Sequence, residues 1–357
     1  ARRQRQMCIR DSTQGARHTF NDADAAISAL RSKDVEMVVG AIPFDSDTPA
    51  ALTVPEAIIR EEGPLEPHAY YRNQSLSSRV VGFDPEPEEH LRRVEAAIGT
   101  IETSKLEKVV LARAVDIEFP EAIDPRLVAA RLIDLSANRD GFIADLSPAG
   151  RPGAMLVGSS PEVLVKRQGS TVSAFPLAGS SPRRASAAED HLAGQDLLHS
   201  SKDLHEHAFV VDHLRRALTP LCERLDIPDV PQLISTNEMW HLGTPISGTL
   251  KDKDLTALEL ALAVHPTPAI CGTPAEAAQA LIETAETDRG FYAGAVGWCD
   301  SSGDGEYMVA IRCAEVAGDG LSARAWAGGG IVGDSDAQAE LEETTAKLRT
   351  ILKALSL

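Results

Sequence analysis

Glu340, Glu343 and Lys347 are the residues whose types and spacing point most directly to chemistry. Residues three or four positions apart lie on the same face of a helix. A helix through this stretch would therefore present both carboxylates and the ammonium group on one side. Carboxylate oxygens suit a divalent cation, so we expect a cation here, beside an anionic small molecule. A solvated acidic helix face is the alternative.

A glycine-rich stretch precedes this predicted helix. We expect a strand over residues 321–327, then a loop of glycines at 328–330, whose bare N–H groups could bind an anion near the helix start. The run 328–333 also fits the G-x-G-x-x-G fingerprint of dinucleotide sites. That interpretation requires a second parallel strand with an acidic residue further along. Since the sequence ends straight after the helix, we do not expect a dinucleotide site.

A second acidic pair, Asp203 and Glu206, has the same spacing within another predicted helix. Two helices that each present such a pair could hold one hard cation through oxygen ligands, and Mg²⁺ suits this arrangement. His205 and His207 raise zinc as an alternative, but neither an H-E-x-x-H spacing nor a cysteine ligand supports it. Each pair alone is also typical of a solvated helix face.

Charged residues interrupt several apolar segments. Lys108 opens a predicted strand, where it could act as a base beside a partly buried pocket or extend into water. Glu162 starts another strand and is either an acid with a raised pKa or an edge charge. Arg312, inside a predicted strand over 306–316, is either paired in the core or binds a carboxylate. His241 is typical of a structural histidine.

The composition excludes several classes of protein. A net charge of −18 argues against nucleic acid and anionic membranes as partners. The five cysteines are scattered without a C-x-x-C pair, which favours reduced thiols and a cytoplasmic protein. No apolar run approaches the roughly 18 residues that span a bilayer. Residues 1–16 lack a secretory signal, and we expect a disordered tail or one added to the natural chain.

The pattern of predicted elements favours an α+β fold. Short turns join neighbouring strands, as in the hairpin loop expected at 300–305, which indicates antiparallel sheets with packed helices. Residues 43–67 read as a surface connection, and no stretch resembles an interdomain linker. We therefore predict one domain over residues 17–357. The predicted helices cover 23–32, 87–104, 189–225 with one break, 255–264 and 274–286.

Several segments, taken in order, resemble the chorismate-utilising enzymes, and most closely the isochorismate synthases of siderophore pathways. The resemblance extends from about residue 108 to 348. Its motifs include KVVLARAVDI from Lys108, GSSPEVLV from Gly158, SSKDLHEHAFVV from Ser200, DRGFYAGAVGWCD from Asp288 and AGGGIV from Ala327. It implies a four-layer α/β/β/α core with two packed, mainly antiparallel sheets.

The resemblance also implies a metal site and a pair of catalytic groups. Mg²⁺ would lie between two helices, with Glu206 and Glu343 as ligands and Glu340 and Asp203 nearby; Asp203 is a shorter acid than some relatives carry. Lys108 would be the base that activates water for attack at C2 of chorismate. Glu162 would be the acid that protonates the departing C4 hydroxyl.

Further positions match substrate-binding residues of the family. The positions that match residues binding the enolpyruvyl carboxylate are Arg312, Tyr292, Lys347, Gly328 and Gly330. Those matching other pocket positions are His241, Ala269, Gly179 and Ser180.

At two positions of these motifs the sequence differs from some family members, which limits the reactions expected. Ser247 stands where relatives with a covalent lysine carry that lysine, and Ala269 stands where ammonia users often carry threonine. Both favour isochorismate synthase, in a siderophore or menaquinone pathway, acting as a monomer without a glutaminase subunit. A salicylate synthase, an ammonia-using anthranilate-type synthase and a non-catalytic metal-binding relative remain alternatives.

Overall fold

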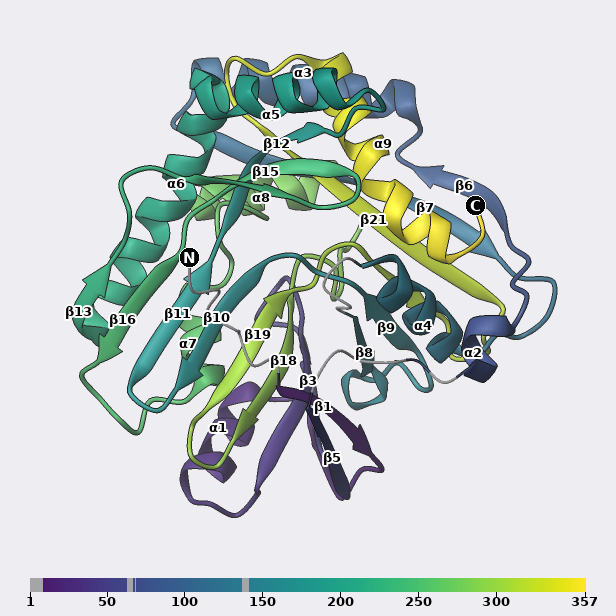
Figure 1. The fold of residues 1–357 in the computed structure, drawn as a ribbon, viewed down its shortest axis with the longest axis vertical. Coiled ribbons are helices and arrows are strands. Elements are labelled where there is room, and N and C mark those ends of the chain that lie inside the picture. The colour runs from purple at the N-terminus through teal and green to yellow at the C-terminus, as the bar shows by residue number, and fades with distance from the viewer. Residues whose placement is uncertain (1–8, 63–66, 68, 137–140) are drawn as a thin grey trace.

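The computed structural model describes residues 9–62, 67, 69–136 and 141–357 (Figure 1). The helices in this part of the chain begin where the sequence offers caps. The side chains of Asp22, Asp124, Ser200 and Asp336 each accept a bond from a backbone N–H in the first turn of a helix. The helices are α1 (Ala23–Arg31), α2 (Ala69–Asn73), α3 (Pro87–Thr103), α4 (Pro125–Leu135), α5 (Ala187–His199), α6 (Ser201–Leu218), α7 (Ala257–Val264), α8 (Ala275–Ala285) and α9 (Ala337–Ala354).

Two large antiparallel sheets form the centre of the molecule. The first has the order β13 (Cys222–Asp226), β16 (Ile246–Leu250), β11 (Thr171–Phe175), β10 (Val163–Gln168), β19 (Gly305–Val309), β18 (Ala295–Asp300), β3 (Met37–Ile42), β4 (Ala51–Val54) and β2 (His18–Phe20). The second has the order β17 (Gly272–Thr273), β7 (Lys108–Glu118), β21 (Ser322–Ile331), β20 (Cys313–Val316), β9 (Met155–Gly158) and β8 (Phe142–Asp145), with β6 (Arg79–Asp84) also beside β7.

Two smaller sheets complete the described strands. One contains β12 (Leu177–Pro182), β15 (Met239–Gly243) and β14 (Gln232–Ser235), and the other pairs β1 (Ile9–Gln14) with β5 (Ala57–Glu62). Every strand pair described is antiparallel. The α+β class with two packed, mainly antiparallel sheets is therefore confirmed.

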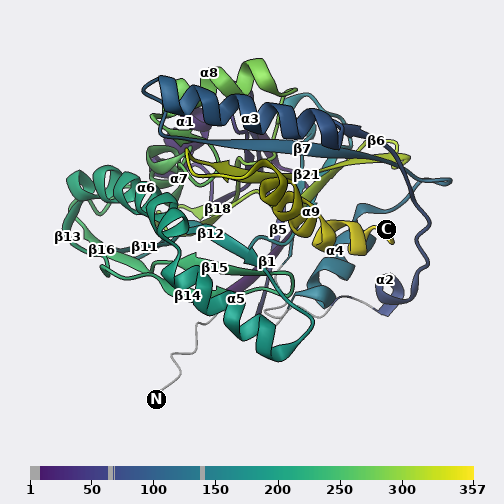
Figure 2. The same cartoon turned by 90° about the horizontal axis from the view of Figure 1, so that it is seen from above.

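Helices cover the outer faces of the two large sheets. Helices α1 and α7 pack on the nine-stranded sheet, while α3, α4 and α9 pack on the seven-stranded sheet; α3 extends along β7 in Figure 2. One buried hydrophobic cluster takes residues from Ala26 near the N-terminus to Ile331 near the C-terminus. Because this core draws on the whole length, we propose that residues 17–357 form one domain.

The glycines at 328–330 lie inside a strand, not in a loop as predicted. Strand β21 continues through them and pairs with β7, so that Gly328 faces Ala112 and Gly330 faces Val110. Helix α9 starts only after Asp336, so these glycines do not form its N-terminus. The prediction of an anion loop at a helix start is wrong.

Steric crowding explains why glycine occupies these positions of the strand. A Cβ at Gly330 would lie 2.2 Å from Glu206 Oε1, and one at Gly329 would lie 3.0 Å from Glu340 Oε2. Glycine is therefore needed so that acidic side chains can approach the strand backbone.

Arg312 is not inside a strand, contrary to prediction. The predicted strand over 306–316 divides into β19 and β20, which belong to different sheets. Arg312 lies in the break with a positive φ of 52°. The chain crosses from one sheet to the other here, and the break turns the arginine into the space between them.

Other element boundaries also differ from prediction. The helical block over 189–225 breaks at Ser200 and ends in strand β13. Residues 43–67 include the strands β4 and β5, and Leu52 in β4 is fully buried. Helix α4 was not predicted, although Asp124 followed by Pro125 is a typical helix start.

Part of the segment predicted as a disordered tail, residues 1–16, forms a strand instead. Residues 1–8 lie outside the described residues, whereas β1 covers residues 9–14 and pairs with β5. Pairing supplies backbone partners to an otherwise open edge of β5, which accounts for the order of this segment.

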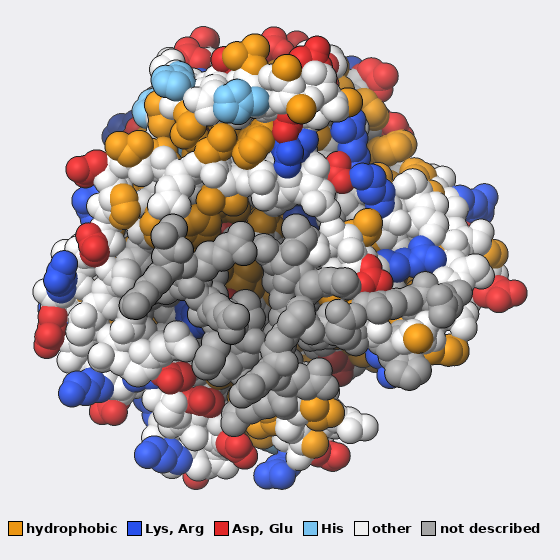
Figure 3. Space-filling model, viewed as in Figure 1, with side chains coloured by type: hydrophobic (Ala, Val, Ile, Leu, Met, Phe, Trp, Pro, Cys, Tyr) orange, Lys and Arg blue, Asp and Glu red, His pale blue; other side chains and the backbone are white. Residues whose placement is uncertain are grey.

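The surface shows no concentration of one charge sign on the face seen in Figure 3, where acidic and basic side chains are interspersed. None of the helices described is long and apolar enough to cross a membrane.

Candidate active site

A cavity lies where β7, β21, β12 and β15 meet helices α6 and α9. It brings together most of the predicted site residues, which come from distant parts of the sequence. The predicted residues that line it are Glu162, Gly179, Ser180, Glu206, His241, Ala269, Tyr292, Arg312, Gly328, Gly330, Glu343 and Lys347. Lys108, Glu340 and Asp203 are not among its lining residues.

Glu162 is a buried carboxyl in the cavity wall, only 3% exposed, immediately before β10. Burial raises its pKa to about 7, against the partial opposition of a bond from Leu177 N and the charge of Lys108. The Leu177 N–H donates to Oε1 over 3.4 Å. Glu162 can therefore be protonated near neutral pH, which is the state a general acid needs.

Lys108 is fully buried at the start of β7 and does not extend into water. Its Nζ lies 3.0 Å from Glu206 Oε1. This contact is an ion pair without the geometry of a hydrogen bond. Among the described residues, Nζ has no hydrogen-bond acceptor. The Lys108 amino group thus lies beside Glu206, with hydrogen-bonding capacity left for a ligand or water.

Glu340 and Glu343 lie on one face of α9, as predicted, and each pairs with a lysine. Lys202 Nζ donates to Glu340 Oε1 at 2.7 Å, and Lys347 Nζ donates to Glu343 Oε1 at 2.5 Å. Burial and the neighbouring Glu343 raise the pKa of Glu340. Burial acts in the same direction on Glu343, but Lys347, Lys202 and Ser180 outweigh it and lower its pKa.

The four predicted metal ligands are near one another but do not form a closed site. Among the residues described, no three His, Cys, Asp or Glu side chains are arranged to hold a metal ion. Asp203 Oδ2 accepts a bond from Ser200 Oγ at 2.5 Å at the start of α6. Its carboxylate therefore serves that helix start.

The donor chemistry of this cluster nevertheless fits a hard cation. Glu206, Glu340 and Glu343 offer carboxylate oxygens from two helices, and Glu340 Oε2 is buried without a hydrogen-bond partner among the described residues. Mutual repulsion contributes to the raised pKa of Glu340. A divalent cation would relieve both the repulsion and the missing partner.

Arg312 is a buried cation in the cavity, 6% exposed, with no carboxylate within ion-pair distance in the described part of the chain. Its Nη2 lies 3.5 Å from His241 Nε2. Burial, together with the charges of Arg312 and Lys347, holds the pKa of His241 well below its usual value, so His241 is neutral. A buried guanidinium without a counter-ion favours a carboxylate on the ligand.

Aromatic and small residues shape the rest of the cavity. Tyr292 stacks on Trp326 with ring centroids 5.7 Å apart, and burial raises the pKa of its phenol. Gly179 has a φ of +77°, and a Cβ there would meet Asp203 at 3.1 Å. Lys347 Nζ also donates to Gly328 O at 3.0 Å, which ties α9 to β21.

Lys202 was missed by the sequence analysis. It carries the only lysine charge that reaches Glu340 in the described residues. Its position four residues before Glu206 places both on one face of α6 and could have revealed it.

Comparisons with known proteins agree with this geometry. A family model described as "Chorismate binding enzyme" matches residues 33–356. The chain is 46% identical over 352 residues to "Putative isochorismate synthase MenF" of Mycobacterium tuberculosis, covering 96% of this chain and 92% of that protein. It is 44% identical over 323 residues to isochorismate synthase DhbC of Bacillus subtilis, covering 89% and 80%.

A solved structure has the same fold. It is the "putative 2,3-dihydroxybenzoate-specific isochorismate synthase, DhbC" from Bacillus anthracis, with a TM-score of 0.89 and 37% sequence identity. The match covers 97% of this chain and 94% of that one.

Proposed function

Because the chain belongs to the chorismate binding enzyme family, we propose that it is an isochorismate synthase, an isomerase that converts chorismate to isochorismate. The observation that carries the proposal is the convergence of three groups in one cavity. These are a buried acid that can be protonated, a buried arginine with no carboxylate within ion-pair distance in the described part of the chain, and the carboxylates of Glu206 and Glu343.

The reaction requires one acid and one base in opposite protonation states. Lys108 accepts a proton from water as the oxygen attacks C2 of chorismate. The ring double bonds shift, the C4–O bond breaks, and Glu162 donates its proton to the departing hydroxyl, which leaves as water. One water is added and one is released, so substrate and product have the same composition.

The substrate's carboxylates have distinct receptors in this proposal. Arg312 supplies a buried guanidinium for the enolpyruvyl carboxylate, and Lys347 and the phenol of Tyr292 lie in the same cavity. The bare backbone at Gly328 and Gly330 lets Tyr292 and Glu206 lie directly against β21. His241, Ala269, Gly179 and Ser180 line other parts of the cavity.

We propose Mg²⁺ as the metal, held by Glu206 and Glu343 with Glu340 beside them. When bound it supplies positive charge that holds the ring carboxylate and withdraws electrons from the ring. Asp203 has an indirect role in this proposal. Its carboxylate accepts a hydrogen bond from Ser200 at the start of α6, the helix that carries Glu206.

The proposal extends to partners and location. A water-using enzyme needs no subunit that delivers ammonia, so we expect the chain to act alone, as a monomer. Cys222, Cys271, Cys299 and Cys313 are free and buried, which supports a reducing compartment such as the cytoplasm.

The experiment that tests this function is a product analysis. The protein is incubated with chorismate and Mg²⁺, the products are separated with mass detection, and pyruvate is assayed in parallel. We expect a new product of unchanged mass without pyruvate. Salicylate with stoichiometric pyruvate, or no turnover, would contradict the proposal.

A further inference from the structure

A buried ion pair, Glu286 with Arg289, lies behind the cavity and is not among its lining residues. Arg289 Nε donates to Glu286 Oε2 at 2.7 Å, and Arg289 Nη2 donates to Glu286 Oε1 at 2.8 Å. The side chain of Arg289 is only 2% exposed and that of Glu286 only 7%. Because breaking a buried pair is costly, both partners are held in one geometry.

The side chains of this pair bond backbone groups of β7 where no neighbouring strand does so on that edge. At one end of β7, β17 pairs with Lys108 and Val109, and at the other end β6 pairs with the residues from Ala114 onward. Neither strand covers the gap between them. There, Arg289 Nη2 donates to Val110 O at 2.7 Å, and Ala112 N donates to Glu286 Oε1 at 2.7 Å.

The same arginine reaches two further parts of the cavity wall. Its Nη1 donates to Ile270 O at 2.7 Å, in the loop that carries Ala269. Its carbonyl accepts the Tyr292 N–H at 3.0 Å. Val110, Ile270 and Tyr292 all line the cavity, and Val110 is two residues from Lys108.

We infer that Glu286 and Arg289 are positioning residues for the reaction. They fix the strand that carries Lys108, the loop that carries Ala269 and the turn that carries Tyr292 in one arrangement. A shift of about 1 Å at a catalytic group can cost about 100-fold in rate. Loss of the pair therefore acts on catalysis as well as on stability.

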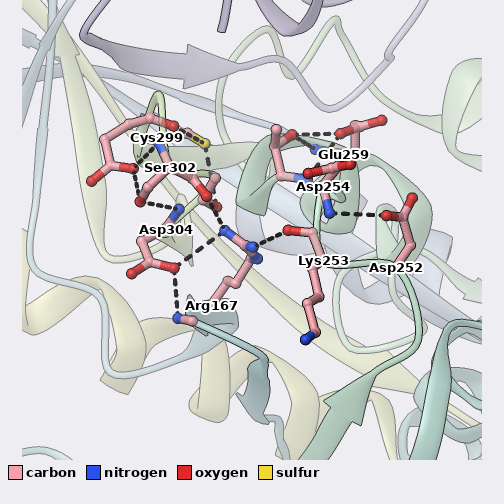
Figure 4. Close-up of polar contacts among 12 residues, drawn as sticks. Arg167, Asp252, Lys253, Asp254, Glu259, Cys299, Ser302 and Asp304 are labelled. Carbon is pink, nitrogen blue, oxygen red and sulfur yellow. Dashed lines mark hydrogen bonds and ion pairs between the residues drawn. The ribbon is translucent and has the colours of Figure 1, made fainter. Parts of the chain in front are cut away.

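Arg167 offers a matched control (Figure 4). It is also a buried arginine that donates to two backbone carbonyls and one carboxylate: Ser302 O at 2.7 Å, Lys253 O at 2.5 Å and Asp304 Oδ1 at 3.2 Å. None of these residues lines the cavity. A purely structural effect should therefore be equal for the two arginines.

The test, which rests on the proposed function, compares kcat, KM and Tm for the wild type and for Arg289→Met, Arg289→Lys and Arg167→Met. All rates are measured with chorismate and Mg²⁺ well below each Tm. We expect Arg289→Met to lower kcat/KM by about 100-fold, with a raised KM, and Arg289→Lys to recover part of the loss. Arg167→Met should lower Tm while leaving KM unchanged.

Unchanged kcat and KM in Arg289→Met, or an equal change in Arg167→Met, would overturn the inference. If Arg289→Met does not fold, Arg289→Lys and the double variant Glu286→Gln/Arg289→Met, which leaves no unpaired charge, are judged by the same criteria. Failure of the wild type to turn over chorismate would instead contradict the proposed function.

Discussion

Identical residue types have opposite electrostatic states within this cavity. Burial raises the pKa of Glu162 to about 7, whereas Lys347, Lys202 and Ser180 overcome burial and lower the pKa of Glu343. One glutamate can thus donate a proton while the other stays ionised beside a cation. Environments that push two carboxyl pKa values apart are a common way to divide acid and ligand roles.

Glu162→Gln is predicted to lower kcat by about 100-fold or more, because the amide cannot donate the proton that the leaving hydroxyl needs. The wild-type rate should fall as the pH rises through about 7, when Glu162 ionises. Steady-state kinetics from about pH 5.5 to 9 would measure both effects. Glu306→Gln, on β19 outside the cavity, serves as the control, and equal kinetics in the two variants would remove Glu162 from the mechanism.

Glu343→Gln is predicted to weaken Mg²⁺ binding by about 10-fold or more, because the carboxylate charge is lost while the shape is kept. Calorimetric titration with Mg²⁺ measures this without substrate. EDTA should abolish wild-type turnover, and added Mg²⁺ should restore it. Full activity in EDTA would refute the metal assignment.

Among the elements, β21 forms a wall of the site because glycines stand where the side chains of helices α6 and α9 approach it. The sequence pattern indicates the glycines and the acidic helix but predicts a loop between strand and helix. Loop and strand are both compatible with a run of glycines, and only the long pairing with β7 decides between them. Arg312 was misplaced for a related reason, since an apolar run does not reveal a crossing between two sheets.

Gly330→Ala is predicted to lower kcat/KM by about 100-fold, because the new Cβ would lie 2.2 Å from Glu206 Oε1 and displace that carboxylate. Stability should fall by about 1–3 kcal/mol from overpacking. Gly99→Ala, in α3 with nothing within 4 Å of the added Cβ, should be neutral or stabilising by about 0.5–1 kcal/mol. Kinetics and thermal melts of both variants provide the comparison; wild-type behaviour of Gly330→Ala would show that the strand tolerates a side chain.

Across the molecule, the cavity combines residues from Val110 to Lys347. The motifs and the resemblance to a family predicted most of its lining, because they name residue types in a fixed order. They could not predict Lys202 or the Glu286–Arg289 pair. The roles of these residues depend on the distance between elements that are remote in sequence.

The stability of the protein should depend on pH through Glu162. Its pKa is about 7 when folded against a usual 4.5, so the folded state binds more protons between these values. The stabilisation from this group is complete below about pH 4.5 and is lost as the pH rises through about 7. The difference in unfolding free energy between the wild type and Glu162→Gln should therefore change by roughly 3 kcal/mol between about pH 4.5 and 8.

Denaturant unfolding in EDTA at several pH values would measure this difference. His207 and His241 have lowered pKa values through burial and shift stability in the opposite direction, but they are common to both proteins and cancel. A difference that does not vary with pH would contradict a buried, protonated Glu162.

We propose that water attacks C2 while the C4 hydroxyl departs, in a cavity that keeps the enolpyruvyl group intact. The most direct test is to incubate the protein with chorismate and Mg²⁺ in water labelled with oxygen-18 and to analyse the products by mass spectrometry. We expect isochorismate that carries one labelled oxygen, with no pyruvate. Unlabelled isochorismate, or pyruvate in proportion to the chorismate consumed, would contradict it.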